Sequence, residues 1–254
     1  MQMKTRVTAL ASLMLLAVTM DAAAVNITLG PSNARCVGMT TAQDESDGAN
    51  KGCMVGHPNV SSHREEYSED AEAAANAEVD TDLNDIPGAS VRHVNVNAQA
   101  VGDSAGDQGM YSSSAEAYSG ADIADGRQHW TLHVNPSPGE TFGAQVGVTI
   151  SATVDGSLDA ATSATSESSW DVQVVQNGQT LNVMSGTANG SGSYSDNGQV
   201  ILAVNLGDTF DLSFAYSAGV RGHRMGSHAN ADVTHSTITI DASGADLIFR
   251  NGFD

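Results

Sequence analysis

Residues 142–154 decide the fold, and they read Phe-Gly-Ala-Gln-Val-Gly-Val-Thr-Ile-Ser-Ala-Thr-Val. Every second residue is apolar, and the residues between them are glycine, glutamine, threonine or serine. Successive side chains of a β-strand point to opposite faces, so this strict alternation predicts a strand with one buried face and one solvated face.

The same alternation recurs on both sides of this stretch. It is found at residues 94–100, 130–134, 170–174, 181–183, 200–206, 210–216 and 229–240. Asn177-Gly178 separates two of these segments and accepts the positive φ angles of a tight turn, which predicts an antiparallel hairpin there. Asn197-Gly198 and Gly207-Asp208 are further turn signals. The apolar parity changes between Val233 and Ile238, which predicts a β-bulge or a short break near His235.

About eight such strands are expected, and no convincing crossover helix lies between them, which excludes a parallel α/β sheet. One apolar face per strand predicts an all-β fold, an antiparallel β-sandwich over residues 91–242. Its layers are expected to be jelly-roll-like or immunoglobulin-like, and its topology stays open.

Residues 1–24 have the pattern of a secretory signal peptide. Lys4 and Arg6 precede an uncharged apolar run, and the small residues that end at Ala24 form a suitable cleavage site. A transmembrane anchor is the alternative, but a helical span needs about 20 apolar residues. No second hydrophobic span follows. We therefore expect a secreted or cell-surface protein with no membrane span in the mature chain.

Residues 25–90 form an acidic, alanine-rich segment that has few large apolar side chains and is expected to be poorly ordered. Residues 71–77 fit a short helix, because alanine and glutamate favour helices, and they fit a weak edge strand equally well. The two cysteines, Cys36 and Cys53, are expected to form a disulfide in an exported chain, worth about 3 kcal/mol. The alternative is a zinc site with His57 and His63, although the spacing fits no compact zinc finger.

The charge balance restricts the partners. The 254 residues include 30 acidic and 10 basic side chains, a formal net charge of −20. Nucleic-acid binding needs a basic patch, and docking on anionic lipid needs basic residues, so neither partner is expected.

Gly102-Asp103-Ser104-Ala105-Gly106 matches the nucleophile elbow of serine hydrolases. The elbow requires a helix directly after the serine, and residues 107–113 do not have a helical pattern. We therefore predict no catalytic residues and no enzyme. A serine hydrolase that uses Ser104 is kept as a remote alternative.

Metal sites are not assigned either. Asp80-Thr81-Asp82 has the spacing that opens an EF-hand loop, but Asp85 and Val91 stand where glycine and glutamate are required. Calcium bound between loops stays an alternative, since oxygen ligands are abundant in so acidic a chain. The eight histidines show no convergent pattern, and His223 and His228 belong to the locally basic residues 221–228.

The aromatic residues fall into two groups. Most lie on the apolar parity of their strands and are expected in the core: Trp130, Phe142, Trp170, Phe210, Phe214 and Tyr216. The others lie in polar surroundings and are the candidates for a carbohydrate platform: Tyr67, Tyr111, Tyr118 and Tyr194.

Two motifs carry a family resemblance. Residues 229–238 read Ala-x-Ala-Asp-Val-x-x-x-x-Ile, and residues 204–212 read Val-x-Leu-Gly-Asp-x-Phe-x-Leu. With these motifs, residues 115–241 resemble the β-rich region of secreted bacterial proteins of the PEP-CTERM and choice-of-anchor kind. The Pro-Glu-Pro motif and anchor of that kind are missing. Residues 243–254 form a C-terminal tail with an Ile-Phe-x-x-Gly-Phe-Asp ending, similar to the terminus of exported proteins of certain Gram-negative bacteria.

The resemblance implies a surface or extracellular matrix role and transfers no catalytic residue. Together, these features predict a non-enzymatic secreted surface, matrix or adhesion-type protein whose partner is an extracellular protein or polysaccharide. A calcium- or carbohydrate-binding module is the alternative.

Overall fold

The computed structural model describes residues 25–29, 34–43, 48–56, 60–67, 71–83, 89–105, 110–119, 129–136, 141–161, 163–223 and 225–243. The predicted signal peptide and almost all of the C-terminal tail lie outside these residues. Fourteen strands and no helix are found in this described part of the chain. It therefore contains no helix that is long and apolar enough to cross a bilayer.

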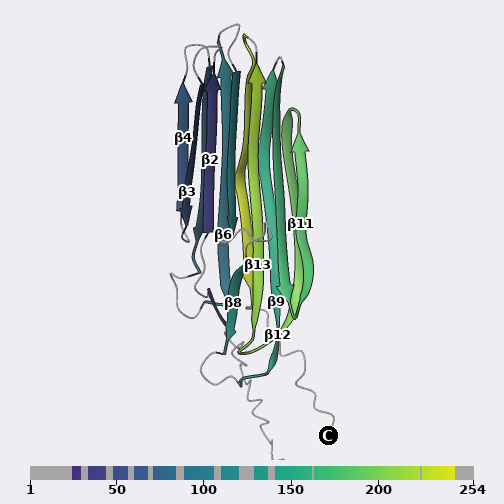
Figure 1. Cartoon of the computed structure of the whole chain (residues 1–254). Helices are drawn as coiled ribbons and strands as arrows, with labels where there is room; N and C mark the ends of the chain where they lie inside the picture. Colours follow the sequence, from purple (N-terminus) through teal and green to yellow (C-terminus); the bar gives the residue numbers. More distant parts are fainter. Residues whose placement is uncertain are drawn as a thin grey trace, which may run out of the picture.

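The strands form two antiparallel sheets that pack as a sandwich, as predicted (Figure 1). The eight-stranded sheet contains β1 (Asn26–Leu29), β2 (Ala34–Gln43), β3 (Gly48–Gly56), β7 (Met110–Ser119), β8 (Trp130–Asn135), β10 (Ala164–Gln176), β11 (Gln179–Asn189) and β13 (Thr209–His223). The six-stranded sheet contains β4 (Val60–Tyr67), β5 (Ala71–Thr81), β6 (Val91–Ser104), β9 (Gln145–Ala161), β12 (Gly192–Asn205) and β14 (His228–Asp241).

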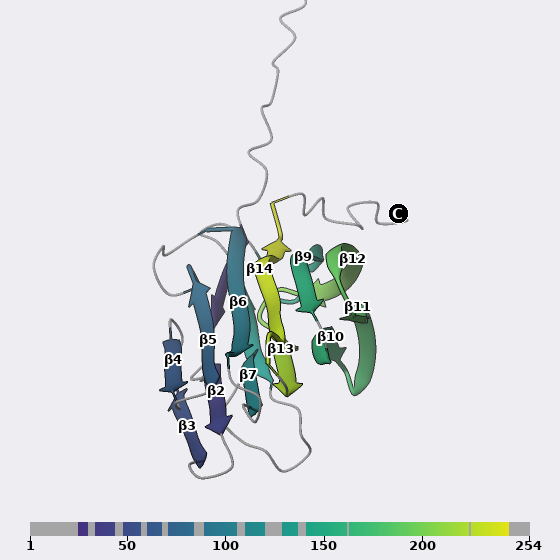
Figure 2. The same ribbon diagram turned by 90° about the horizontal axis from the view of Figure 1, so that it is seen from above.

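The order of the six-stranded sheet is β12-β9-β14-β6-β5-β4. The other sheet runs β1-β8-β13-β7-β2-β3, and β10 with β11 continues it from β13. Figure 2 shows β3 and β4 at one side of the sandwich and β11 and β12 at the other. The sandwich thus has two open sides, each formed by an edge strand from each sheet.

The alternating stretch that predicted the fold is β9, an interior strand between β12 and β14. Val146, Val148 and Ile150 are fully buried, while Thr153 and Asp155 face the solvent. Phe142 does not follow this pattern, because it is 74% exposed. The prediction of a core role for Phe142 was wrong, since the strand begins only at Gln145 and the preceding turn at Gly143 (φ +82°) breaks the alternation.

The predicted bulge is confirmed. Val233 of β14 lies opposite Ala98 of β6, and Ser236 lies opposite Val96, so two residues of β14 face one residue of β6. The extra residue shifts the parity of β14 and keeps Ile238 in the core.

One of the two Asn-Gly predictions is confirmed. Asn177 (φ +52°) and Gly178 (φ +75°) form the tight turn between β10 and β11. Asn197-Gly198 is no turn, because it lies inside β12. A Cβ atom at position 198 would collide with the carbonyl oxygen of Val183, so this glycine allows β11 to approach closely.

Residues 25–90 contribute five strands to the same two sheets. The alanine-rich stretch is strand β5 rather than a helix, and it is an interior strand rather than an edge, because it lies between β4 and β6. Alternate alanines of β5 are buried, among them Ala75 and Ala77, which lie opposite Ala100 and Ala98 of β6. Small side chains thus form the core at this end of the sandwich.

The predicted disulfide is not supported by the strand register. Cys36 of β2 lies opposite Val55, and Cys53 of β3 lies opposite Gly38. This diagonal separates Cα atoms by about 7–8 Å, beyond the usual range for a disulfide. The side chain of Cys53 lies outside the described residues, as do those of His57 and His63. The Cys36–Cys53 bridge therefore stays a prediction.

Candidate functional site

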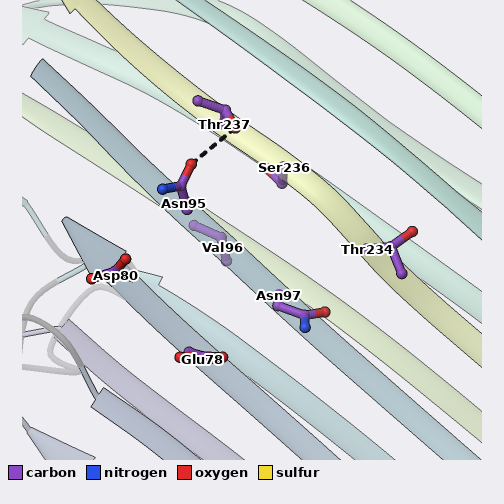
Figure 3. A pocket seen from close by; sticks show the side chains of 8 residues that line it. All are labelled: Glu78, Asp80, Asn95, Val96, Asn97, Thr234, Ser236 and Thr237. Carbon is purple, nitrogen blue, oxygen red and sulfur yellow. Dashed lines mark hydrogen bonds between the residues drawn. The ribbon is translucent and has the colours of Figure 1, made fainter.

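A hollow of about 250 Å³ lies on the outer face of the six-stranded sheet, next to the β14 bulge (Figure 3). We call it the bulge pocket. Its lining comes from three adjacent strands: Glu78 and Asp80 of β5, Asn95, Val96 and Asn97 of β6, and Thr234, Ser236 and Thr237 of β14.

The strand register places the polar lining residues in facing pairs. Glu78 lies opposite Asn97, and Asp80 lies opposite Asn95. On the other side of β6, the Thr237 hydroxyl donates a 3.0 Å hydrogen bond to the Asn95 side-chain oxygen (Figure 3). The bulge interrupts the pairing next to Asn97, so this amide lacks a regular cross-strand neighbour on β14.

Asn97 is the most unusual group of the pocket. Its side-chain oxygen is buried and accepts no hydrogen bond from the described residues. A buried polar atom without a partner costs about 1–3 kcal/mol. A ligand that offers a hydroxyl donor or a cation at this oxygen would remove that cost.

Ser236 is a lining residue of the bulge pocket that faces inward. The side chain of Ser236 is buried and faces the core, where it lies near Tyr216. Burial raises the pKa of the Tyr216 phenol, and the Ser236 hydroxyl partly offsets this rise.

The lining of the bulge pocket is rich in side chains that form hydrogen bonds. It combines two carboxylates, two amides and three hydroxyl groups, and none of its eight lining residues is a histidine, cysteine, lysine or arginine. The lining residues are not typical of a transition-metal site, which uses histidine or cysteine ligands. No group of three or more histidine, cysteine or acidic side chains converges in the described part of the chain.

Ser104 does not lie in a nucleophile elbow. It is the last residue of β6, and it is fully buried. Its backbone pairs with the loop before β14, through Ser227 and Gly226. The nearby His228 is paired with Asp103 and lies on the outer face, 2.9 Å from the Asp159 carboxylate. Ser104 and His228 therefore face opposite sides of the sheet.

Asp80 and Asp82 have different roles. Asp80 lines the bulge pocket, whereas Asp82 accepts a 2.7 Å hydrogen bond from the His93 backbone N–H and lies 3.0 Å from His93 Nδ1. Asp80 belongs to strand β5, and Asp82 follows the end of that strand.

Of the four tyrosines considered as platform candidates, Tyr111 is buried. Tyr194 stacks on Trp170 with ring centroids 5.1 Å apart, and its hydroxyl donates to the Asp232 carbonyl. Tyr118 is half-buried in the other sheet, and the side chain of Tyr67 lies outside the described residues. Tyr111, Tyr118 and Tyr194 therefore do not form one surface, because Tyr111 is buried and Tyr194 packs against Trp170 of the other sheet.

Arg92 is a buried charged residue that no sequence signal indicated. Its side chain is 1% exposed, although its neighbours alternate like any strand. The guanidinium donates to the Ile27 carbonyl (3.1 Å) and the Asp82 carbonyl (3.0 Å). It thereby connects β1, the first described strand, to the end of β5.

Comparisons with protein-family models, with curated proteins and with solved structures find no match for this chain.

Proposed function

We propose that this protein is a secreted, non-enzymatic surface or matrix protein of the adhesion type that binds polysaccharide through the outer face of its six-stranded sheet. The observation that carries the proposal is the bulge pocket, in which two carboxylates face two amides across adjacent strands. Carboxylates accept hydrogen bonds and amides both donate and accept them, so such pairs match the hydroxyl groups of a sugar.

The surface around the pocket supports an extended ligand. Its outward side chains are mainly uncharged and polar, among them Thr149, Ser151 and Thr153 of β9, Gln99 of β6, and Thr239 of β14. Hydroxyl and amide groups exchange hydrogen bonds with water and with sugar hydroxyls alike, so a chain of sugars extending from the pocket meets suitable partners. The export signal and the resemblance to surface proteins agree with this role.

Binding to a panel of bacterial and plant polysaccharides, measured by co-sedimentation and calorimetry, tests the proposal. Asn97→Ala and Glu78→Gln are expected to weaken binding by roughly tenfold each, the effect of losing about one charged or buried hydrogen bond. Glu116→Gln, at an exposed position of β7 in the eight-stranded sheet, serves as the matched control. Absence of binding across the panel, or equal binding by Asn97→Ala and the wild type, would refute the proposal.

Calcium in the same pocket is the second candidate. The unpartnered Asn97 oxygen and the carboxylates of Glu78 and Asp80 are all oxygen ligands of the kind that calcium prefers. A cation that binds only the folded protein raises the midpoint of thermal unfolding. An unchanged midpoint in millimolar calcium, or the same rise in Glu78→Gln, would exclude this site.

A further inference from the structure

Strand β12 is an edge of the six-stranded sheet, and its hydrogen-bonding groups divide by parity. In the register with β9, even-numbered residues of β12 lie opposite even-numbered residues of β9. The backbone of Leu206, just after the strand, forms hydrogen bonds with Ala144 and Gly143, so the even-numbered residues are those whose backbone groups point to β9. The N–H and C=O of one strand residue point to the same side. The odd-numbered residues therefore present their backbone groups to the open edge, as the Ala203 carbonyl confirms by accepting a bond from the Gln176 side chain.

Side chains cap this open edge at two positions. The Asn197 N–H donates a 2.9 Å bond to the Asp196 carboxylate, and the Ala203 carbonyl accepts a 2.8 Å bond from the Gln176 amide. Between these caps, Gln199 and Ile201 make no edge hydrogen bond with any residue that the structure describes. The open window thus consists of two adjacent odd positions.

The window also lacks the features that normally protect an edge strand. Residues 198–206 contain no charged residue and no proline, and Ile201 is 68% exposed. Charges and prolines on edge strands prevent pairing with another chain. On the opposite side of the sandwich, β4 contains Arg64, Glu65 and Glu66.

The neighbouring edge strand β11 does not close the window. The register between β10 and β11 shifts next to Val183, and the Val183 carbonyl lies where a Cβ atom of Gly198 would be. The Cβ atoms of even residues in β12 point toward the core, so β11 covers the inner face of β12 at Gly198. The edge at Gln199 and Ile201 stays open among the described residues.

We propose that β12 is a self-association surface, on which two copies of this chain pair β12 with β12 in antiparallel fashion around a twofold axis at Val200. In this register Gln199 lies opposite Ile201 of the second copy, and Ile201 lies opposite its Gln199. Each pair exchanges two backbone hydrogen bonds. The open window of one copy therefore meets the open window of the other, and the Asp196 and Gln176 caps flank the paired region on both sides.

A second copy fits this edge better than an unrelated strand. A twofold axis at Val200 places the two open positions of one copy opposite the two open positions of the other. The window has no charge that would select a charged partner. Pairing around a twofold axis gives a dimer and leaves no further β12 edge open. The six-stranded sheets of the two copies would then form one continuous sheet. Each copy carries a net charge of −20, so repulsion opposes association and salt is expected to strengthen it.

Sedimentation velocity of the purified chain at about 10–100 μM, in 0.15 M and 0.5 M salt, tests the proposal. We expect a monomer–dimer equilibrium that shifts toward dimer at the higher salt. Ile201→Pro removes an N–H that points to the open edge and leaves the bonds to β9 intact. Two hydrogen bonds are then lost per dimer, so the dissociation constant should rise roughly tenfold or more.

Ser193→Pro is the matched control, because it makes the same change at an odd position of β12 outside the paired region. It should dimerise like the wild type, and circular dichroism should show the same strand content and melting midpoint for both variants. A wild type that stays monomeric at both salt concentrations would overturn the proposal. Equal dimerisation of Ile201→Pro and the wild type, or equal weakening by Ser193→Pro, would overturn it as well.

Discussion

The indole of Trp170 and the phenol of Tyr194 stack with ring centroids 5.1 Å apart and an angle of 5° between their planes, although they belong to different sheets. Trp170 comes from β10, and its Nε1 donates a 2.9 Å bond to Asp196 of β12. Tyr194 comes from β12, and its hydroxyl donates to the Asp232 carbonyl of β14. This aromatic pair connects the two sheets near the open side formed by β11 and β12.

Gly186 of β11 makes room for this pair, because a Cβ atom there would collide with the Trp170 ring. Gly186→Ala is expected to destabilise the fold by about 1–3 kcal/mol, the usual cost of overpacking. Denaturant unfolding followed by tryptophan fluorescence measures the change. Ser185→Ala is the matched control, because Ser185 is the exposed residue directly before Gly186 in β11.

Alkaline pH is expected to destabilise the sandwich through its buried tyrosines. Burial raises the pKa of Tyr111 to about 12 and also raises the pKa values of Tyr216 and Tyr194. An unfolded phenol releases its proton near pH 10, whereas the folded Tyr111 keeps it until about pH 12. The unfolded state therefore binds fewer protons in this interval, and stability falls as pH rises through it, by up to about 1.4 kcal/mol per pH unit for Tyr111.

Urea unfolding at pH 8, 10 and 11 measures this dependence. Tyr111→Phe should show a shallower loss of stability above pH 10 than the wild type, since one linked proton is removed. Equal slopes for the two proteins would show that Tyr111 does not contribute.

Removal of the Arg92 guanidinium is expected to loosen the N-terminal strand. Arg92→Met keeps the volume of the side chain but leaves the carbonyls of Ile27 and Asp82 without their donor. The expected loss is about 2–4 kcal/mol, because each lost bond had a charged donor and leaves an acceptor unpaired. Hydrogen exchange should report faster opening of β1 and the adjoining β8, and unchanged exchange there would contradict this role.

Deletion of Thr234 is expected to remove the bulge without unfolding the sheet. Val233 would then be followed by one outward residue before Ser236, so Val233, Ser236 and Ile238 all keep facing the core. The melting midpoint should change little, while ligand binding at the bulge pocket should be lost. If the deletion variant binds the ligand as the wild type does, the ligand site does not depend on the bulge.

The period-two patterns predicted most strands after residue 91, their buried faces, the Asn177-Gly178 hairpin and the bulge near His235, because each of these depends on residues adjacent in the sequence. They did not predict β1 to β4 or β7, whose sequences lack a clear apolar alternation. The failures came from the same source. Phe142 continues the alternation of β9 but precedes the strand, and Asn197-Gly198 has the composition of a turn but lies inside one.

Which strands become neighbours was decided by tertiary structure. Alternation shows that β5 has an apolar face, but its interior position depends on pairing with β4 and β6. The bulge pocket likewise combines residues of the consecutive strands β5 and β6 with residues of the distant strand β14, and Arg92 is satisfied by carbonyls that only the folded chain brings near. The sequence alone determined the local alternation of side chains, since that follows from strand geometry. Partners, edges and pockets were determined only by the fold, because they depend on which distant segments form hydrogen bonds with one another.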